Sequence, residues 1–69
     1  MKENVSERFG KNLKAIREFL GLSQQKLAEM TKLTPAAISQ IENGLRDPGF
    51  KTIVILLKEL NVTFERMLK

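Results

Sequence analysis

The chain has 69 residues, 42% of them hydrophobic and 29% charged, which is the profile of one small folded domain rather than a disordered chain. It contains neither cysteine nor histidine, and this excludes thiol catalysis, disulfides, Cys/His zinc sites and imidazole general bases. A net charge of +4 hints at a polyanionic partner, although the basic residues are spread along the chain rather than clustered.

The first predicted helix begins near Ser6, a residue that can accept a backbone hydrogen bond as an N-cap. It ends at Gly21, where a left-handed backbone costs little. Gly10 is expected to weaken this helix by about 1 kcal/mol relative to alanine. Apolar residues at helical spacing predict one buried face, made of Phe9, Leu13, Ile16 and Leu20.

Two shorter helices follow. Ser23 predicts the start of the second, and Thr34-Pro35, a cap followed by proline at the first helical position, predicts the start of the third. Asn43-Gly44 predicts the end of the third helix. The apolar residues of this region are Leu27, Ala28 and Met30 in the second helix, then Ile38, Ile41 and Leu45, which are expected to face the core.

The fourth predicted helix follows the loop at 47–49 and runs to Leu60, with Asn61 as a left-handed stop. Thr63 predicts the start of a short fifth helix. Ile55 falls off the main apolar face of the fourth helix. The apolar residues are Phe50, Ile53, Val54, Leu57 and Leu60 in the fourth helix, and Phe64, Met67 and Leu68 in the fifth.

Helices this short cannot bury an apolar face alone, so they are expected to pack against one another. The chain is therefore predicted to be all-α, a five-helix orthogonal bundle, with residues 1–69 forming a single domain. The first ten residues hold no apolar signal-peptide core, and the longest apolar run, 53–57, is too short to span a bilayer. These features predict a cytoplasmic protein with no membrane partner.

The segment 24–45 predicts two helices joined by a tight turn, the pattern of a helix-turn-helix. Together with its flanks it resembles the phage repressor and Cro-type (XRE-like) helix-turn-helix family over residues 9–68. The match is specific because its core and polar positions occur in the family's order. The residues that carry it are Ile16, Arg17, 21–24, Leu27, Ala28, 38–44, Pro48, 60–63 and Leu68.

The resemblance implies a lambda-repressor-like fold with its helix-turn-helix motif at about 24–44. It also implies a nucleoid-associated, repressor-like transcriptional regulator that binds a two-fold symmetric double-stranded DNA operator as a homodimer. The helix at 35–43 would read the major groove. The sequence offers no nucleophile–base pair, metal-ligand cluster or glycine-rich phosphate loop, so no enzyme activity, catalytic residue, cofactor, metal or small-molecule substrate is expected.

The third predicted helix carries one face of short, uncharged side chains opposite its core residues. Such a face can approach DNA closely, as a helix in the major groove must. Taken alone, it is more often ordinary solvated surface, and only together with the resemblance does it predict DNA contact. Its residues are Ala36, Ser39, Gln40 and Asn43.

Five residues are candidate base contacts. The Gln40 amide can pair bidentately with an adenine edge, and Ser39 can reach either kind of base edge. Pro35 and Ala36 could touch a thymine methyl group. The resemblance places Gln24, at the start of the second helix, beside both the base contacts and a phosphate.

Five further residues are candidate phosphate contacts, which position a protein on DNA without reading its sequence. Ser23 and Thr34 begin the two motif helices, where exposed backbone N–H groups suit a phosphate. Asn43, Arg46 and Lys51 follow the third helix, where the family touches the DNA backbone. For Arg46 and Lys51, a solvated surface charge is nearly as good an explanation.

The resemblance assigns Arg17 and Glu42 to a partly buried structural ion pair that ties the first helix to the third. A contact of Arg17 with phosphate is the competing interpretation. Lys32 stands where the family usually has glycine, so a positive φ and mild strain are predicted there.

A second hypothesis is a protein-interaction or antitoxin-like module on the same fold. The apolar Ile55, where the family commonly has a polar residue, would then cover part of a partner surface. An isolated exposed apolar side chain is the plainer explanation of the same residue.

Overall fold

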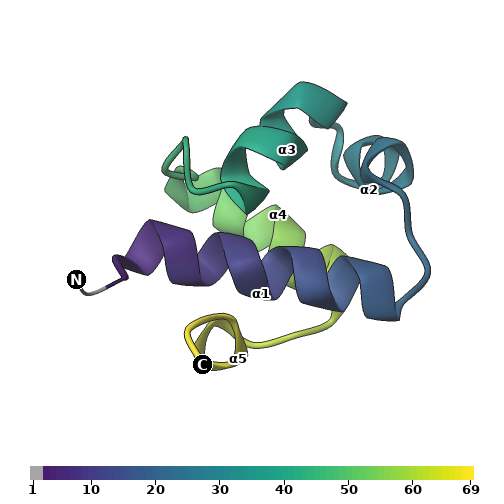
Figure 1. Cartoon of the computed structure of the whole chain (residues 1–69). Helices are drawn as coiled ribbons and strands as arrows, with labels where there is room; N and C mark the ends of the chain where they lie inside the picture. Colours follow the sequence, from purple (N-terminus) through teal and green to yellow (C-terminus); the bar gives the residue numbers. More distant parts are fainter. Residues whose placement is uncertain (1–2) are drawn as a thin grey trace.

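The computed structural model describes residues 3–69, which form five helices and no strand (Figure 1). The fold is thus an all-α bundle of five helices, as predicted; residues 1 and 2 of the predicted 1–69 domain lie outside the described part. No helix in this part is long and apolar enough to cross a membrane. The helices are α1 Val5–Phe19, α2 Gln24–Thr31, α3 Pro35–Glu42, α4 Phe50–Leu60 and α5 Phe64–Met67.

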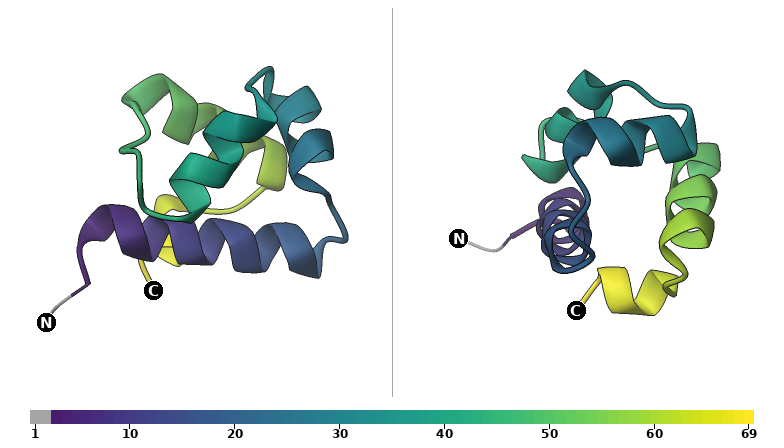
Figure 2. Two further views of the ribbon diagram at one scale, coloured as in Figure 1. Left: turned by 45° about the horizontal axis from the view of Figure 1, so that its top comes forward. Right: turned by 90° about the vertical axis from the view of Figure 1, so that its right-hand side faces the viewer.

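The long helix α1 packs against α3 on one side and α5 on the other, and α2 packs against α3 and α4. The right-hand view of Figure 2 shows α1, α2, α4 and α5 arranged around the core. The backbone carbonyl of Met67 accepts a hydrogen bond from the Asn12 amide, 2.6 Å away, which fixes α5 on α1. The most deeply buried apolar side chains are Phe9, Leu13, Leu27, Ile38, Ile41, Leu56 and Met67.

The start of α1 differs from the prediction, because Asn4 and not Ser6 is its N-cap. The Asn4 side chain accepts a hydrogen bond from the Glu7 backbone N–H (2.8 Å), and the Glu7 carboxylate accepts one from the Asn4 N–H (3.0 Å). This reciprocal pair is a capping box. Ser6 lies inside the helix, where its hydroxyl donates to the Asp47 carboxylate. The other predicted caps, Ser23, Thr34 and Thr63, are confirmed.

Helices α1 to α4 end in the same way, with a residue in the left-handed conformation just beyond the last turn. These residues are Gly21, Lys32, Gly44 and Asn61, with φ of 72°, 61°, 71° and 55°. The residue after each of them donates its backbone N–H to the carbonyl five positions earlier. The predicted stops at Gly21 and Asn61, and the predicted positive φ of Lys32, are therefore confirmed.

An apolar residue follows each left-handed position, and these four residues do not share one environment. Leu22, Leu33 and Val62 pack against the core, whereas Leu45 is 78% exposed. The prediction that Leu45 faces the core is wrong, because the chain has already left α3 and is turning towards α4 at this point. Leu20 is also exposed, contrary to prediction, since it is the C-cap residue of α1 and lies beyond its last turn.

The buried face of α4 is rotated from the predicted one. Phe50 and Val54, expected in the core, are 81% and 45% exposed, whereas Leu56 and Leu60 are buried. The sequence is ambiguous here because the apolar run at 53–57 offers more than one helical face. Contact with α2 selects the face that contains Leu56.

Gly10 has the opposite role to the one predicted. It is buried where α1 crosses α3, and a Cβ at this position would overlap the carbonyl oxygen of Ile41. The missing side chain therefore allows the two backbones to approach closely, which outweighs the lower helix propensity of glycine.

Candidate nucleic-acid interface

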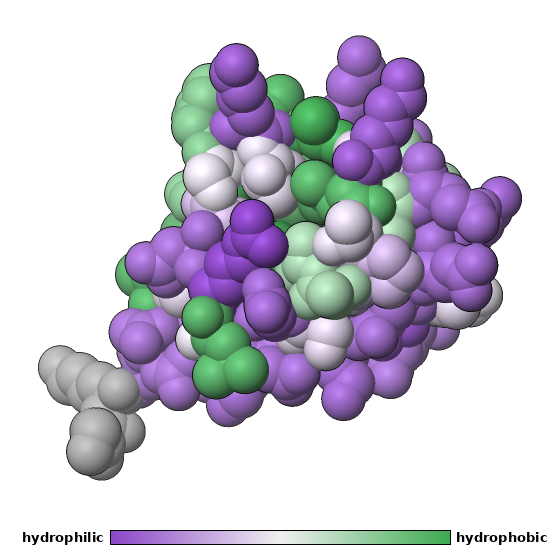
Figure 3. Space-filling view, turned by 90° about the horizontal axis from the view of Figure 1, so that it is seen from above, coloured by the Kyte–Doolittle hydropathy of each residue, from purple (hydrophilic) through white to green (hydrophobic). Residues whose placement is uncertain are grey.

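The surface of α3 is set by its two buried isoleucines. Ile38 and Ile41 are almost completely buried, which directs the opposite side of the helix outward. Figure 3 shows the molecule from the side of α3, where pale and light green side chains of intermediate hydropathy are bordered by hydrophilic ones. On this outward side Ala36, Gln40 and Asn43 are exposed and Ser39 is half-buried.

Two hydroxyl groups mark the starts of α2 and α3. Ser23 Oγ accepts a hydrogen bond from the Lys26 N–H at 2.9 Å, and Thr34 Oγ1 accepts one from the Ala37 N–H at 3.0 Å. Both capping residues are exposed, and Pro35, which follows Thr34, is exposed too. Because each hydroxyl acts as an acceptor towards its helix, its own hydrogen remains available to a group outside the protein.

The structure places Arg17 and Glu42 in direct contact between α1 and α3. Arg17 Nε lies 2.6 Å from Glu42 Oε2, and Nη2 lies 3.2 Å from Oε1. Arg17 Nη1 also donates to the carbonyl of Leu22 at 2.7 Å. The two residues are only 8% and 5% exposed, and the hydrogen bonds that Arg17 donates to the Glu42 carboxylate raise the pKa of Arg17. The pair is therefore buried and bidentate, and Arg17 faces the interior of the protein.

Gln24 belongs to the same network, a contact that sequence reasoning missed. Its Nε2 donates to Glu42 Oε1 at 3.0 Å, so the amide at the start of α2 is fixed by the end of α3. Glu42 was the signal in the sequence that could have indicated this contact. A buried carboxylate can accept more hydrogen bonds than one guanidinium donates to it, so a further donor is expected nearby. Gln24 remains half-buried at the edge of the exposed face of α3, with its oxygen unused by this contact.

Side chains after α3 fold back onto its exposed face. The Asn43 amide donates to Ser39 Oγ, and Arg46 Nη1 donates to Gln40 Oε1, each at 3.4 Å. The structure thus joins Gln40 and Arg46, which the sequence had assigned to different roles. Lys51 is exposed in the first turn of α4 and takes no part in these contacts.

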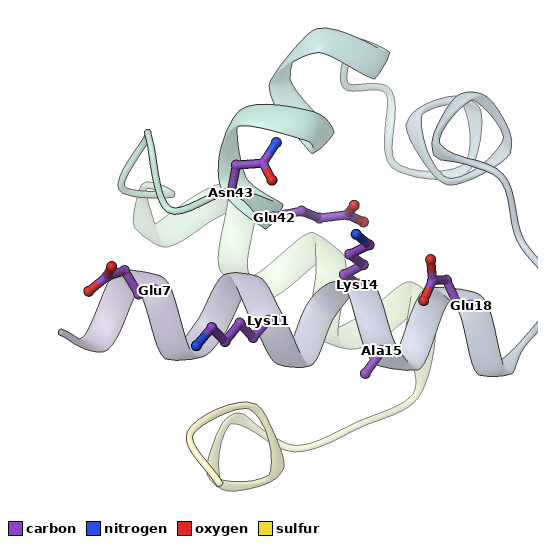
Figure 4. Close-up of a pocket in the computed structure, with 7 residues that line it drawn as sticks. All are labelled: Glu7, Lys11, Lys14, Ala15, Glu18, Glu42 and Asn43. Carbon is purple, nitrogen blue, oxygen red and sulfur yellow. The ribbon is translucent and has the colours of Figure 1, made fainter. Parts of the chain in front are cut away.

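A groove of about 450 Å³ runs along α1 beside the end of α3 (Figure 4). In Figure 4, Lys14 points from α1 towards the carboxylate of Glu42, while Asn43 points away from α1. Throughout residues 3–69, every buried side-chain nitrogen or oxygen has a hydrogen-bond partner, and no group of three His, Cys, Asp or Glu side chains could hold a metal ion. The buried carboxylate of the groove, that of Glu42, is therefore satisfied by Arg17 and Gln24.

Comparison with known proteins identifies relatives of this chain. The model of the helix-turn-helix family matches residues 13–67. The HTH-type transcriptional regulator YqaE of Bacillus subtilis (strain 168) is 34% identical over 61 residues, which cover 88% of this chain and 53% of YqaE. The chain thus spans about half the length of this relative. Control protein C.SmaI of Serratia marcescens is 31% identical over 65 residues, covering 94% of this chain and 77% of C.SmaI.

A solved structure supports the same relationship. The restriction-modification controller protein C.AhdI from Aeromonas hydrophila superposes with a TM-score of 0.84 and 27% sequence identity. The superposition covers 90% of this chain and 94% of C.AhdI. The arrangement of α1 to α5 is therefore shared with a controller protein over nearly the whole length of both chains.

Proposed function

Because the chain belongs to the XRE-type helix-turn-helix family of DNA-binding transcription regulators, we propose that it binds double-stranded DNA in a sequence-specific manner and represses transcription. Residues 1–69 act as one domain in this proposal, with the motif at 24–44 and α3 in the major groove. The protein works in the cytoplasm, associated with the nucleoid, and needs no cofactor.

The observation that carries the proposal is the outward face of α3. Its side chains are short and uncharged, and the helix is fixed from below by Ile38 and Ile41 and at its end by Glu42. A helix that projects small polar groups can enter the major groove, which is about 12 Å wide. A rigid helix also presents these groups without further ordering.

Five residues are proposed to face the bases. Ser39 and Gln40 lie at the centre of the α3 face, and Pro35 and Ala36 lie in its first turn, where a thymine methyl group would meet an apolar surface. Gln24 reaches the same side from α2. Its contact with Glu42 fixes the amide and leaves the oxygen as an acceptor for a base amino group.

Phosphate contacts are proposed for the residues around this face. Ser23 and Thr34 each offer a free hydroxyl hydrogen beside the N-terminus of a helix, where a negative charge is stabilised. Asn43 and Lys51 lie beyond the other end of α3 and are exposed. Arg46, which the sequence also assigns to a phosphate contact, donates a hydrogen bond to Gln40 beside the α3 face.

The proposed active form is a homodimer on a two-fold symmetric operator, with half-sites about one helical turn apart, roughly 34–36 Å. Exposed apolar side chains on α4, on α5 and directly after α5 support this assembly, since a second copy would cover them. They are Phe50, Val54, Ile55, Phe64 and Leu68. A protein-interaction module would use the same side chains for a different partner.

Selection of bound duplexes from a random pool, followed by titration over a range of salt concentrations, tests the proposal. We expect a preferred, two-fold symmetric sequence and an affinity that falls steeply with salt. A variant with Ser39→Ala and Gln40→Ala should lose this preference while its melting temperature is unchanged, and Glu59→Ala, exposed on α4, is the matched control. Unaffected activity in the double variant would favour the interaction module instead.

A further inference from the structure

The turn after α3 returns the chain to the helix it has just left. Gly44 takes the left-handed conformation, and the Leu45 N–H donates to the Gln40 carbonyl at 2.9 Å. Arg46 therefore lies beside Gln40, six positions earlier, and its Nη1 donates to Gln40 Oε1 at 3.4 Å. Both side chains are exposed, and their contact places Arg46 beside the α3 face.

No carboxylate neutralises this guanidinium. Within residues 3–69, none of the ion pairs involves Arg46. The adjacent carboxylate, Asp47, accepts a hydrogen bond from Ser6 on α1 instead. An arginine carries five N–H donors, so four remain free after the bond to Gln40.

The contact also changes what Gln40 can offer. Its amide oxygen accepts from the guanidinium, and this contact leaves the two N–H bonds of its Nε2 available as donors. Gln40 and Arg46 thus form one unit whose available groups are mainly hydrogen-bond donors. Such a unit fits a base edge that carries acceptors only.

We infer that the Gln40–Arg46 pair reads a guanine in the major groove, an inference that rests on the proposed DNA binding. Guanine presents two acceptors there, N7 and O6, and arginine contacts to these atoms are the commonest specific contacts in protein–DNA complexes. Adenine presents an amino group that would have to reach the amide oxygen beside a positive charge. Gln40 therefore does not make the adenine contact that its side chain alone suggests, and Arg46 determines specificity.

The test uses the whole chain and its selected duplex, with one base pair exchanged at a time. We expect a G·C pair in each half-site whose replacement by A·T weakens binding about 10- to 100-fold. Replacement of this guanine by 7-deazaguanine, which lacks the N7 acceptor, should weaken binding as well.

Two variants and one control separate base reading from phosphate contact. Arg46→Ala should bring the G·C to A·T ratio at this base pair close to 1, and Gln40→Ala should lower the ratio at the same base pair because Arg46 is no longer held. Lys51→Ala should weaken all duplexes alike and reduce the salt slope by about 1. Melting curves verify that each variant is folded, which is expected because all three side chains are exposed.

Three results would overturn the inference. They are a selected site without guanine, a uniform loss for Arg46→Ala like that of Lys51→Ala, and effects of Gln40→Ala and Arg46→Ala at unrelated base pairs. If the unmodified chain binds no duplex in a salt-dependent manner, the proposed function fails as well. Duplex binding with a uniform Arg46→Ala effect removes only the inference.

Discussion

The contact between α1 and α3 differs in kind from the surface formed by α4 and α5. At the contact between α1 and α3, Gly10 lets the two backbones meet. Arg17 and Glu42 form a hydrogen-bonded ion pair there, and each residue is less than 10% exposed. At the second, large apolar side chains such as Phe50 and Val54 remain in solvent. The polar and apolar groups of the first region are buried and paired within one chain. The exposed apolar side chains of the second region would be buried only by a partner molecule. Substitutions in the first should therefore change folding, and those in the second should change association.

The largest loss of stability is expected for Arg17→Met. It leaves the buried Glu42 carboxylate without its cation, which costs about 3–5 kcal/mol. Urea denaturation measures the free energy of unfolding, with Arg8→Met, an exposed arginine of the same helix, as control. The double variant with Arg17→Met and Glu42→Leu should recover much of the loss, because no uncompensated charge remains. Equal stability of Arg17→Met and Arg8→Met would show that the pair adds nothing to folding.

Gly10→Ala is expected to destabilise by about 1–3 kcal/mol, because the added Cβ pushes α1 away from the Ile41 carbonyl. Helix propensity alone predicts the opposite sign, a gain of about 1 kcal/mol. Gly49→Ala is the control, since a Cβ there meets no atom within 4 Å and φ is −72°. Thermal melts of the two variants decide between close approach and propensity.

Lys32→Gly is expected to stabilise by about 0.5–1 kcal/mol. Lys32 ends α2 with φ of 61°, a conformation that is strained for lysine and free of strain for glycine, although glycine also gains entropy in the unfolded chain. For a domain of this size, the melting temperature should rise by a few degrees. A clear fall would show that the lysine side chain contributes more than its backbone strain removes.

The smallest change in folding stability is expected for Val54→Ser combined with Ile55→Ser, within about 0.5 kcal/mol for the monomer, since both side chains are exposed. Association should weaken nevertheless, because these residues belong to the surface proposed to meet a second copy. Sedimentation equilibrium measures the dimer constant, and Lys58→Ser on the same helix is the control. A dimer unaffected by the double substitution would place the interface elsewhere.

Local chemistry made most of the helix boundaries predictable. A serine or threonine hydroxyl can cap the helix that follows it, as it does at Ser23, Thr34 and Thr63. Glycine and asparagine adopt the left-handed conformation readily, which makes the helix ends at Gly21, Gly44 and Asn61 predictable. The start of α1 was missed because Asn4 and Ser6 are both competent caps, and the reciprocal bond with Glu7 favours Asn4.

What the sequence did not reveal depends on residues far apart in the chain. The buried side of α4 is chosen by its contact with α2, and the value of Gly10 depends on a carbonyl of α3. The hydrogen bond from Gln24 to Glu42 joins positions 18 residues apart. A resemblance aligns each residue with its family position but does not specify which hydrogen bonds this chain forms. The sequence therefore placed Gln40 on the exposed face of α3 but could not show that its amide oxygen accepts a hydrogen bond from Arg46.

The Arg17 network joins three segments of the chain. Arg17 binds the Leu22 carbonyl before α2 and Glu42 at the end of α3, and Glu42 in turn binds Gln24. Breaking any one of these contacts exposes the others to water, so the end of α1, the start of α2 and the end of α3 should form a single cooperative unit in native-state hydrogen exchange. DNA bound at this unit would then slow exchange in the interior of the protein as well as at its surface.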